Sequence, residues 1–265
     1  MTAAPTAPES PALSARGPRL PVPTVVLTAI AAAWALAVVA DLSGRAEVLH
    51  HDALIEGGLP TWAALTLFLA AWQAMIAAMM LPSSLPLIRL FAFTSREQPR
   101  AETARAAFLG GYVLVWTTFG AVAFLGDLAI HRAVDALPWL HERPWLIAGG
   151  VFLLAGAFQF SALKHACLSK CRHPGSFLLR YYRRGASPAL RLGLRHGLFC
   201  VGCCWALMLV LFAAGVASLV WMAALTALMV YEKTGRHGDA VTPVAGTALL
   251  AVGVLVLGAG LVLPA

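Results

Sequence analysis

Five cysteines form two groups in the sequence, Cys167 with Cys171, and Cys200 with Cys203 and Cys204. Residues three and four apart share one face of an α-helix, so each group can present its thiols together. Five cysteines are few for a chain of 265 residues, and none of them is isolated. Their grouping therefore predicts a site that uses thiol chemistry, either metal binding or redox exchange.

Two histidines accompany these thiols. His196 precedes Cys200 by four residues, so it extends the same helical stripe, and His173 follows Cys171 by two residues. Four thiolates can bind a soft metal such as Zn(II) or Cu(I), and imidazole can contribute a further ligand. We therefore expect a soft transition metal, copper or zinc, at Cys167, Cys171, Cys200, Cys203 and Cys204, with His173 and His196 as further candidate ligands.

Methionines form a second pattern, in which Met75 and Met79 are four residues apart and Met80 follows directly. Thioether sulfur selects Cu(I) over harder ions. Methionine also fills irregular contacts between helices, so packing alone is the competing explanation. We include Met75, Met79 and Met80 as candidate metal ligands.

The composition identifies the elements that must hold these side chains. Hydrophobic residues make up 60% of the chain and charged residues 12%, and the mean hydropathy is +0.79. Soluble domains carry about 25% charged residues, so the chain is expected to be an integral membrane protein. Its net charge of +7 then reports topology rather than nucleic-acid binding.

A membrane-spanning helix needs about 20 mostly apolar residues. We expect about seven spans, with six as the alternative, in an all-α transmembrane helix bundle. The expected spans are residues 22–40, 60–81, 104–126, 144–163, 198–214, 216–231 and 241–263. The run 198–231 is too long for one span, and Gly215 near its middle predicts a turn between two short helices. A single tilted or kinked helix is the competing interpretation of that run.

Basic residues alternate between the ends of these spans. All but three of the 19 Lys and Arg residues fall in the tail and in every second loop, and loop 164–196 holds basic residues and no acid. Because cytoplasmic loops carry the excess of basic residues, we expect the amino terminus inside and the carboxyl terminus outside. Both cysteine groups then lie on the cytoplasmic side, where thiols stay reduced and structural disulfides are rare.

The segments outside the spans give three further expectations. Residues 1–21 are rich in Pro, Ala and Ser and predict a disordered tail before a membrane domain of residues 22–265. Residues 1–40 could alternatively be a cleaved signal peptide. Segment 176–194 mixes aromatic, apolar and basic residues, which predicts a helix lying on an anionic inner leaflet.

Over about residues 60–235 the sequence resembles a bacterial family described as predicted metal-binding integral membrane proteins, the domain-of-unknown-function 2182 family. The resemblance rests on four separate motifs in the same order: Trp72, Met75, Ala78, Met79, Met80 and Pro82; Lys164, Cys167, Leu168, Cys171, Arg172 and Pro174; Gly202, Cys203, Cys204, Trp205, Ala206, Leu207 and Met208; and Trp221, Met222, Glu232 and Lys233. It implies metal binding and leaves the activity open.

Three functions remain possible at this point. The first is a membrane protein of the bacterial cytoplasmic membrane that handles copper or zinc, with other membrane or metal-delivery proteins as possible partners. The second is a membrane thiol–disulfide redox protein, because Cys200 and Cys203 have the spacing of redox pairs. The third is a structural subunit whose cysteines are incidental. No catalytic triad spacing is evident, so an enzyme is not expected.

Overall fold

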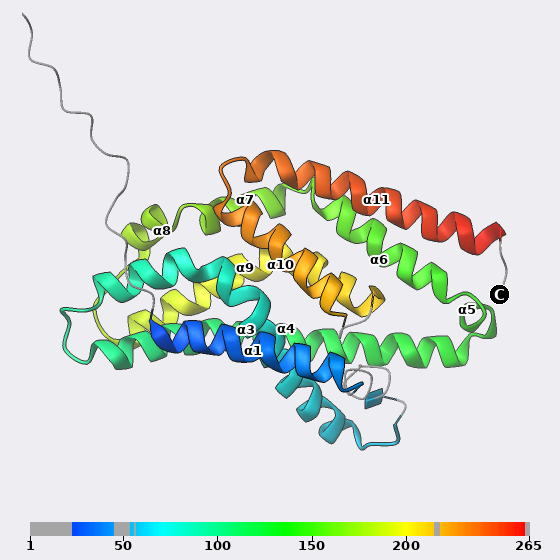
Figure 1. The fold of residues 1–265 in the computed structure, drawn as a ribbon, viewed down its shortest axis with the longest axis horizontal. Helices are drawn as coiled ribbons and strands as arrows, with labels where there is room; N and C mark the ends of the chain where they lie inside the picture. Colours follow the sequence, from blue (N-terminus) through cyan, green and yellow to red (C-terminus); the bar gives the residue numbers. More distant parts are fainter. Residues whose placement is uncertain (1–22, 45–53, 56, 215–217, 263–265) are drawn as a thin grey trace, which may run out of the picture.

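The computed structural model describes residues 23–44, 54–55, 57–214 and 218–262, and these form α-helices joined by short connections (Figure 1). The helices are α1 (Thr24–Leu42), α3 (Thr61–Thr94), α4 (Ala101–Ala136), α5 (Pro138–His141), α6 (Pro144–Phe158), α7 (Ala162–Arg172), α8 (Pro174–Tyr181), α9 (Ala186–Ala214), α10 (Leu219–Thr234) and α11 (Gly238–Val262). No strand occurs among the described residues, so the expected all-α class is confirmed. The tail 1–21 lies outside them.

The helix lengths confirm a multi-pass membrane protein. Among the described helices, α1, α3, α4, α9 and α11 are long and apolar enough to cross a membrane. Helices α6 and α7 meet at an angle of 64° and count as a sixth span if they form one broken crossing. Helix α10 has 16 residues, fewer than the ~20 that a full crossing needs. The number supported is therefore five or six, so the six-span alternative is the most that the described helices support and the expected seven is not reached.

The apolar run 198–231 forms two helices, as expected. Helix α9 ends at Ala214 and α10 begins at Leu219. Gly215, where the turn was predicted, lies outside the described residues.

The start of α9 differs from the prediction, because the helix begins at Ala186 rather than at residue 198. Its first turns are amphipathic: Leu192 and Gly193 are buried while Arg191 and Arg195 are exposed. A search for continuous apolar residues cannot detect such a stretch. In consequence Cys200 lies near the middle of a long helix rather than at its beginning.

The predicted surface helix over residues 176–194 is wrong. Helix α8 ends at Tyr181, and the chain turns before α9 begins at Ala186. Gly185 has a φ of +107° in this turn. That backbone conformation is open to glycine and strained for other residues, so the glycine separates two helices where the composition suggested one.

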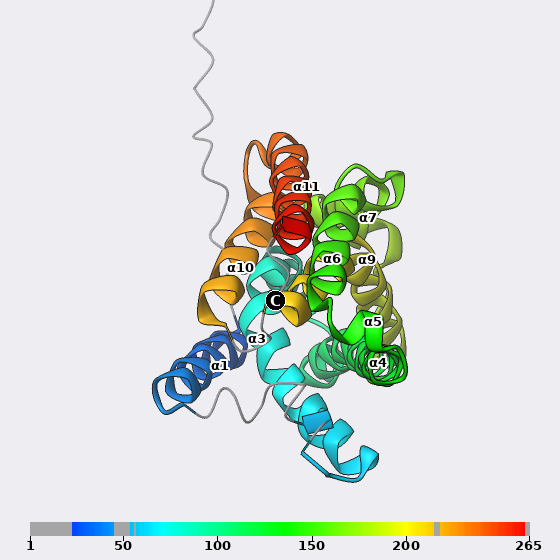
Figure 2. The same ribbon diagram turned by 90° about the vertical axis from the view of Figure 1, so that its right-hand side faces the viewer.

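The long helices run back and forth along the longest axis of the molecule (Figure 1). The connection between α3 and α4, the segment around α8 and the connection between α10 and α11 lie at one end, on the left of Figure 1. The basic loops assigned to one side of the membrane belong to these same segments. Figure 2 looks along the molecule and shows α1 at one edge, with α6 and α11 side by side.

Glycines allow α4 and α9 to approach each other closely. A Cβ atom at Gly193 would collide with the backbone carbonyl of Phe108, and one at Gly111 would collide with that of Leu190. Membrane helices use such small residues at their contacts, because lipid supplies no hydrophobic driving force between helices. The contact fixes the position of the cysteine-bearing helix against α4.

Helix α3 contains Pro82 and Pro86 and is bent (Figure 1). A proline lacks the backbone N–H that would bond the carbonyl four residues earlier, so Pro82 leaves the carbonyl of Ala78 free. The indole N–H of Trp34 on α1 donates to that carbonyl at 3.0 Å. The bend next to Met79 and Met80 is thus stabilised from the neighbouring helix.

The helical structure is interrupted before α7, the first helix that carries cysteines. Helix α6 ends at Phe158, and α7 begins anew with Ser161 as its N-cap, whose hydroxyl accepts the N–H of Lys164 at 3.1 Å. A serine at this position satisfies one of the free donors of the first helical turn. The new direction carries Cys167 and Cys171 back toward α9.

Candidate metal centre

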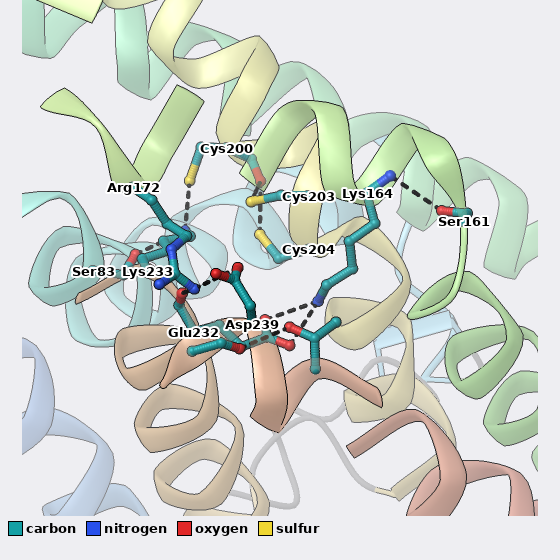
Figure 3. A network of polar contacts seen from close by, with 12 residues as sticks. Ser83, Ser161, Lys164, Arg172, Cys200, Cys203, Cys204, Glu232, Lys233 and Asp239 are labelled. Carbon is teal, nitrogen blue, oxygen red and sulfur yellow. Dashed lines mark hydrogen bonds and ion pairs between the residues drawn. The ribbon is translucent and has the colours of Figure 1, made fainter. Parts of the chain in front are cut away.

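Helix α9 carries three cysteines into the core of the bundle. Cys200, Cys203 and Cys204 are at most 1% exposed. The thiols of Cys203 and Cys204 both donate to the backbone carbonyl of Cys200, at 3.1 and 2.8 Å (Figure 3). All five cysteines are free thiols. The three cysteines therefore share one face of α9, as their spacing predicted, and that face is buried.

Helix α7 adds the second cysteine group to the same region. Helix α7 packs against α9, and Cys171 lies within electrostatic reach of Cys203. Cys167 packs against Gly202, where a Cβ atom would lie only 2.6 Å from the cysteine sulfur. The two groups, separated by some thirty residues of sequence, thus meet as expected.

Helix α3 contributes a thioether sulfur. The Cys204 Sγ atom lies 3.9 Å from the Sδ atom of Met80, and Met80 is fully buried. Met75 and Met79 are also buried in the helix core, but among the described residues neither has a hydrogen bond with a cysteine thiol like that of Met80. Of the three candidate methionines, the structure brings Met80 to the thiols.

A lysine lies beside the first cysteine of α9. The ammonium of Lys233 on α10 is 3.2 Å from the sulfur of Cys200 and donates to the hydroxyl of Ser83 at 2.9 Å (Figure 3). The hydroxyl of Tyr112 on α4 lies 3.3 Å from the same sulfur. The cysteine is therefore surrounded by polar hydrogens inside an apolar bundle.

The two candidate histidines have different positions. His196 is buried, its ring stacks on that of Tyr112, and its Nε2 atom is 3.1 Å from the hydroxyl of Ser84. His173 is exposed at the end of α7, and its Nδ1 atom lies 2.8 Å from the carbonyl of Ser169. The structure thus keeps His196 near the site through a hydroxyl bridge and does not bring His173 to the thiols.

Three residues of this region were not identified from the sequence. Tyr112, Ser83 and Ser84 form a hydroxyl network with Cys200, Lys233 and His196. Adjacent serines next to Pro82 in an otherwise apolar helix were the available signal, since polar residues inside a membrane usually face the bundle interior. Tyr112 gave no such signal, because tyrosine is common in membrane helices.

A buried ion pair connects the cysteine helix α7 to α10. The ammonium of Lys164 donates to both carboxylate oxygens of Glu232, at 2.9 and 2.8 Å, and both side chains are almost completely buried. Arg172 at the end of α7 donates to the backbone carbonyl of Glu232 at 3.2 Å and to the carboxylate of Asp239 at 2.8 Å. These contacts hold the cysteines of α7 and Lys233 of α10 in one arrangement (Figure 3).

A pocket of about 470 Å³ lies beside Cys167. Its lining residues are Leu163, Cys167, Tyr181, Arg195, Leu198, Phe199 and Gly202. Within the described residues, no group of three or more His, Cys, Asp or Glu side chains is already arranged around one point as a ligand set. A metal held by these thiols would therefore require side-chain rotations.

Comparison with known protein families gives one match. Residues 69–256, more than half of the chain, match a family model described as PpoB2, copper chaperone. No curated protein and no solved structure matches the chain. The matched range contains all five cysteines, the three candidate methionines and Lys233. It names copper where the sequence resemblance implied only a metal, and it favours metal handling over the redox and structural alternatives.

Proposed function

This chain belongs to the PpoB2 copper chaperone family, and on that premise we propose that its buried cluster of cysteines and one methionine holds copper as Cu(I) for transfer to another protein. We name the cluster by its five residues, Cys171, Cys200, Cys203, Cys204 and Met80, and call it the sulfur cluster.

The contact between Cys204 and Met80 carries this proposal. It places a thioether from α3 at 3.9 Å from a thiol of α9. Thiolate and thioether ligands together select Cu(I) among the biological metals, whereas Zn(II) sites are built from thiolate, imidazole or carboxylate. This contact and the family description both support copper rather than zinc in the proposal.

The remaining candidate residues take supporting places in the proposal. Cys167 lines the pocket, and His196 orients the hydroxyl of Ser84. We assign no ligand role to His173, which is exposed. The motifs that resemble the domain-of-unknown-function 2182 family contain Cys171, Cys203, Cys204 and Met80, so we propose that they describe this same copper site.

Direct measurement of the bound ion tests the proposal. The full chain, purified in detergent under reducing conditions, should bind Cu(I) in competition with a chromophoric chelator, and X-ray absorption should show sulfur as the ligand atom. Nitrogen or oxygen ligands, or failure of the wild-type chain to compete for Cu(I), would contradict it.

We further propose that the chain lies in the bacterial cytoplasmic membrane with its amino terminus inside. The support is the distribution of basic residues, which gather in the segments at one end of the bundle. These basic residues also suit an anionic inner leaflet. Copper-receiving proteins are the expected partners, because the family is described as copper chaperones.

Reporter fusions test this orientation. A reporter joined after Arg184, in the turn before α9, is expected to be active in the cytoplasm, because this segment carries basic residues and no acid. A reporter joined after Asp135 is expected to be active outside. The opposite result at both positions would place the cysteine side of the bundle in the oxidising compartment and refute the proposed orientation.

A further inference from the structure

Lys233 is an uncommon neighbour for a set of metal-binding thiols. Its side chain is 5% exposed, although it carries a positive charge. A buried charge is costly unless an opposite charge or hydrogen-bond acceptors compensate it. The contacts of its ammonium are the hydroxyl of Ser83 at 2.9 Å and the sulfur of Cys200 at 3.2 Å, and neither is a carboxylate.

The nearby carboxylates are already compensated. Both oxygens of Glu232 are bound by Lys164, and Asp239 is bound by Arg172. Each of these pairs is neutral as a whole. Among the described residues around the sulfur cluster, the ammonium of Lys233 is thus a buried positive charge that no carboxylate balances.

The thiols are the groups that face this charge. Cys171, Cys200, Cys203 and Cys204 all lie within electrostatic reach of Lys233. A Cu(I) ion bound by two thiolates forms a complex of charge −1, and the ammonium brings the whole site to zero. A divalent ion on the same two thiolates forms a neutral complex, so the ammonium leaves the whole site with an unbalanced charge of +1 in an interior of low dielectric constant.

We propose that Lys233 is the residue that selects the charge of the bound ion: its buried ammonium favours a monovalent cation on the sulfur cluster and disfavours divalent cations. This inference rests on the proposed copper site and adds a basis for its selectivity. At any fixed set of thiolates the repulsion by the ammonium is twice as large for a divalent ion as for Cu(I). Thiolates alone do not supply this discrimination, since Zn(II) also binds thiolates, so the ammonium adds to the preference for Cu(I) that the thioether of Met80 gives.

Removal of the positive charge of Lys233 should therefore change the ratio of the Cu(I) affinity to the Zn(II) affinity. In Lys233→Met the affinity for Zn(II) is expected to rise relative to that for Cu(I), and the Cu(I)-to-Zn(II) affinity ratio should fall on the order of tenfold or more. Lys233→Arg keeps the charge and should keep the wild-type ratio. Lys170→Met removes an exposed charge from α7 and serves as the matched control.

The experiment is a pair of competition titrations on the purified full chain, one with Cu(I) and one with Zn(II), each against a chromophoric chelator. Equal ratios in wild type and Lys233→Met would overturn the inference while leaving the copper site in place. A wild-type chain that binds no Cu(I) would instead defeat the proposed function. If Lys233→Met does not elute as a single species, Lys233→Gln provides a neutral side chain that can still donate a hydrogen bond to Ser83. Its Cu(I)-to-Zn(II) affinity ratio is then compared with that of the wild type.

Discussion

Replacement of Cys200, Cys203 and Cys204 by serine is expected to abolish Cu(I) binding by the purified chain. The three thiols lie on the buried face of α9, and two of them surround the carbonyl of Cys200 within 3.1 Å. Serine retains the shape and the hydrogen bond but offers a hard oxygen that Cu(I) does not prefer. Even a lost outer-shell partner costs a metal site roughly 10- to 100-fold in affinity, so loss of three ligands should leave copper at background level.

Elemental analysis of detergent-purified protein measures this loss, with circular dichroism to verify helix content. The matched control is His173→Ala, because this candidate ligand is exposed and lies away from the thiols. It should bind copper like the wild type. Equal copper content in the triple serine variant and the wild type would show that the ion is held elsewhere.

Replacement of Lys164 by methionine is expected to destabilise the protein by about 3–5 kcal/mol, the usual cost of removing one partner of a buried ion pair. The carboxylate of Glu232 would remain in the interior without the ammonium that now binds both of its oxygens. The contact between α7 and α10 would weaken, and the thiol of Cys171 would be less firmly held near Cys203. Copper affinity should fall together with stability.

Denaturant unfolding in detergent, followed by circular dichroism, measures the change in unfolding free energy. The double variant Lys164→Met with Glu232→Met should recover most of the loss, since exchanging a whole buried pair for apolar side chains is often close to neutral. Lys170→Met, an exposed lysine on the same helix, controls for the loss of a positive charge. A single Lys164→Met variant as stable as the wild type would show that this ion pair does not stabilise the contact between α7 and α10.

The sequence was sufficient to predict the membrane class and the grouping of the cysteines. Continuous apolar runs identify the helices, and spacing of three and four residues identifies a shared helix face. The division of residues 198–231 was predictable because no single span needs so many apolar residues. The early start of α9 was not, because its first turns alternate buried leucine with exposed arginine and so lower the mean hydropathy of the segment.

The polar environment of Cys200 depends on helix packing that spacing does not encode. Lys233 and Tyr112 reach the same sulfur from α10 and α4, 33 and 88 residues away in the chain. Close contact of α4 with α9 depends on Gly111 and Gly193, and the direction of α7 depends on the break before Ser161. Such long-range contacts follow from the assembled bundle, and no local pattern predicts which polar side chains they bring together.

The hydrogen bond from Trp34 to the carbonyl of Ala78 bears on the segment that resembles a secretion leader. Pro82 deprives that carbonyl of its donor within α3, and Trp34 on α1 replaces it. Proteolysis after residue 40 would remove this tryptophan and leave an unsatisfied carbonyl beside Met79 and Met80, at a cost of about 1–3 kcal/mol. The first helix thus completes the backbone hydrogen bonding of α3 beside the methionines.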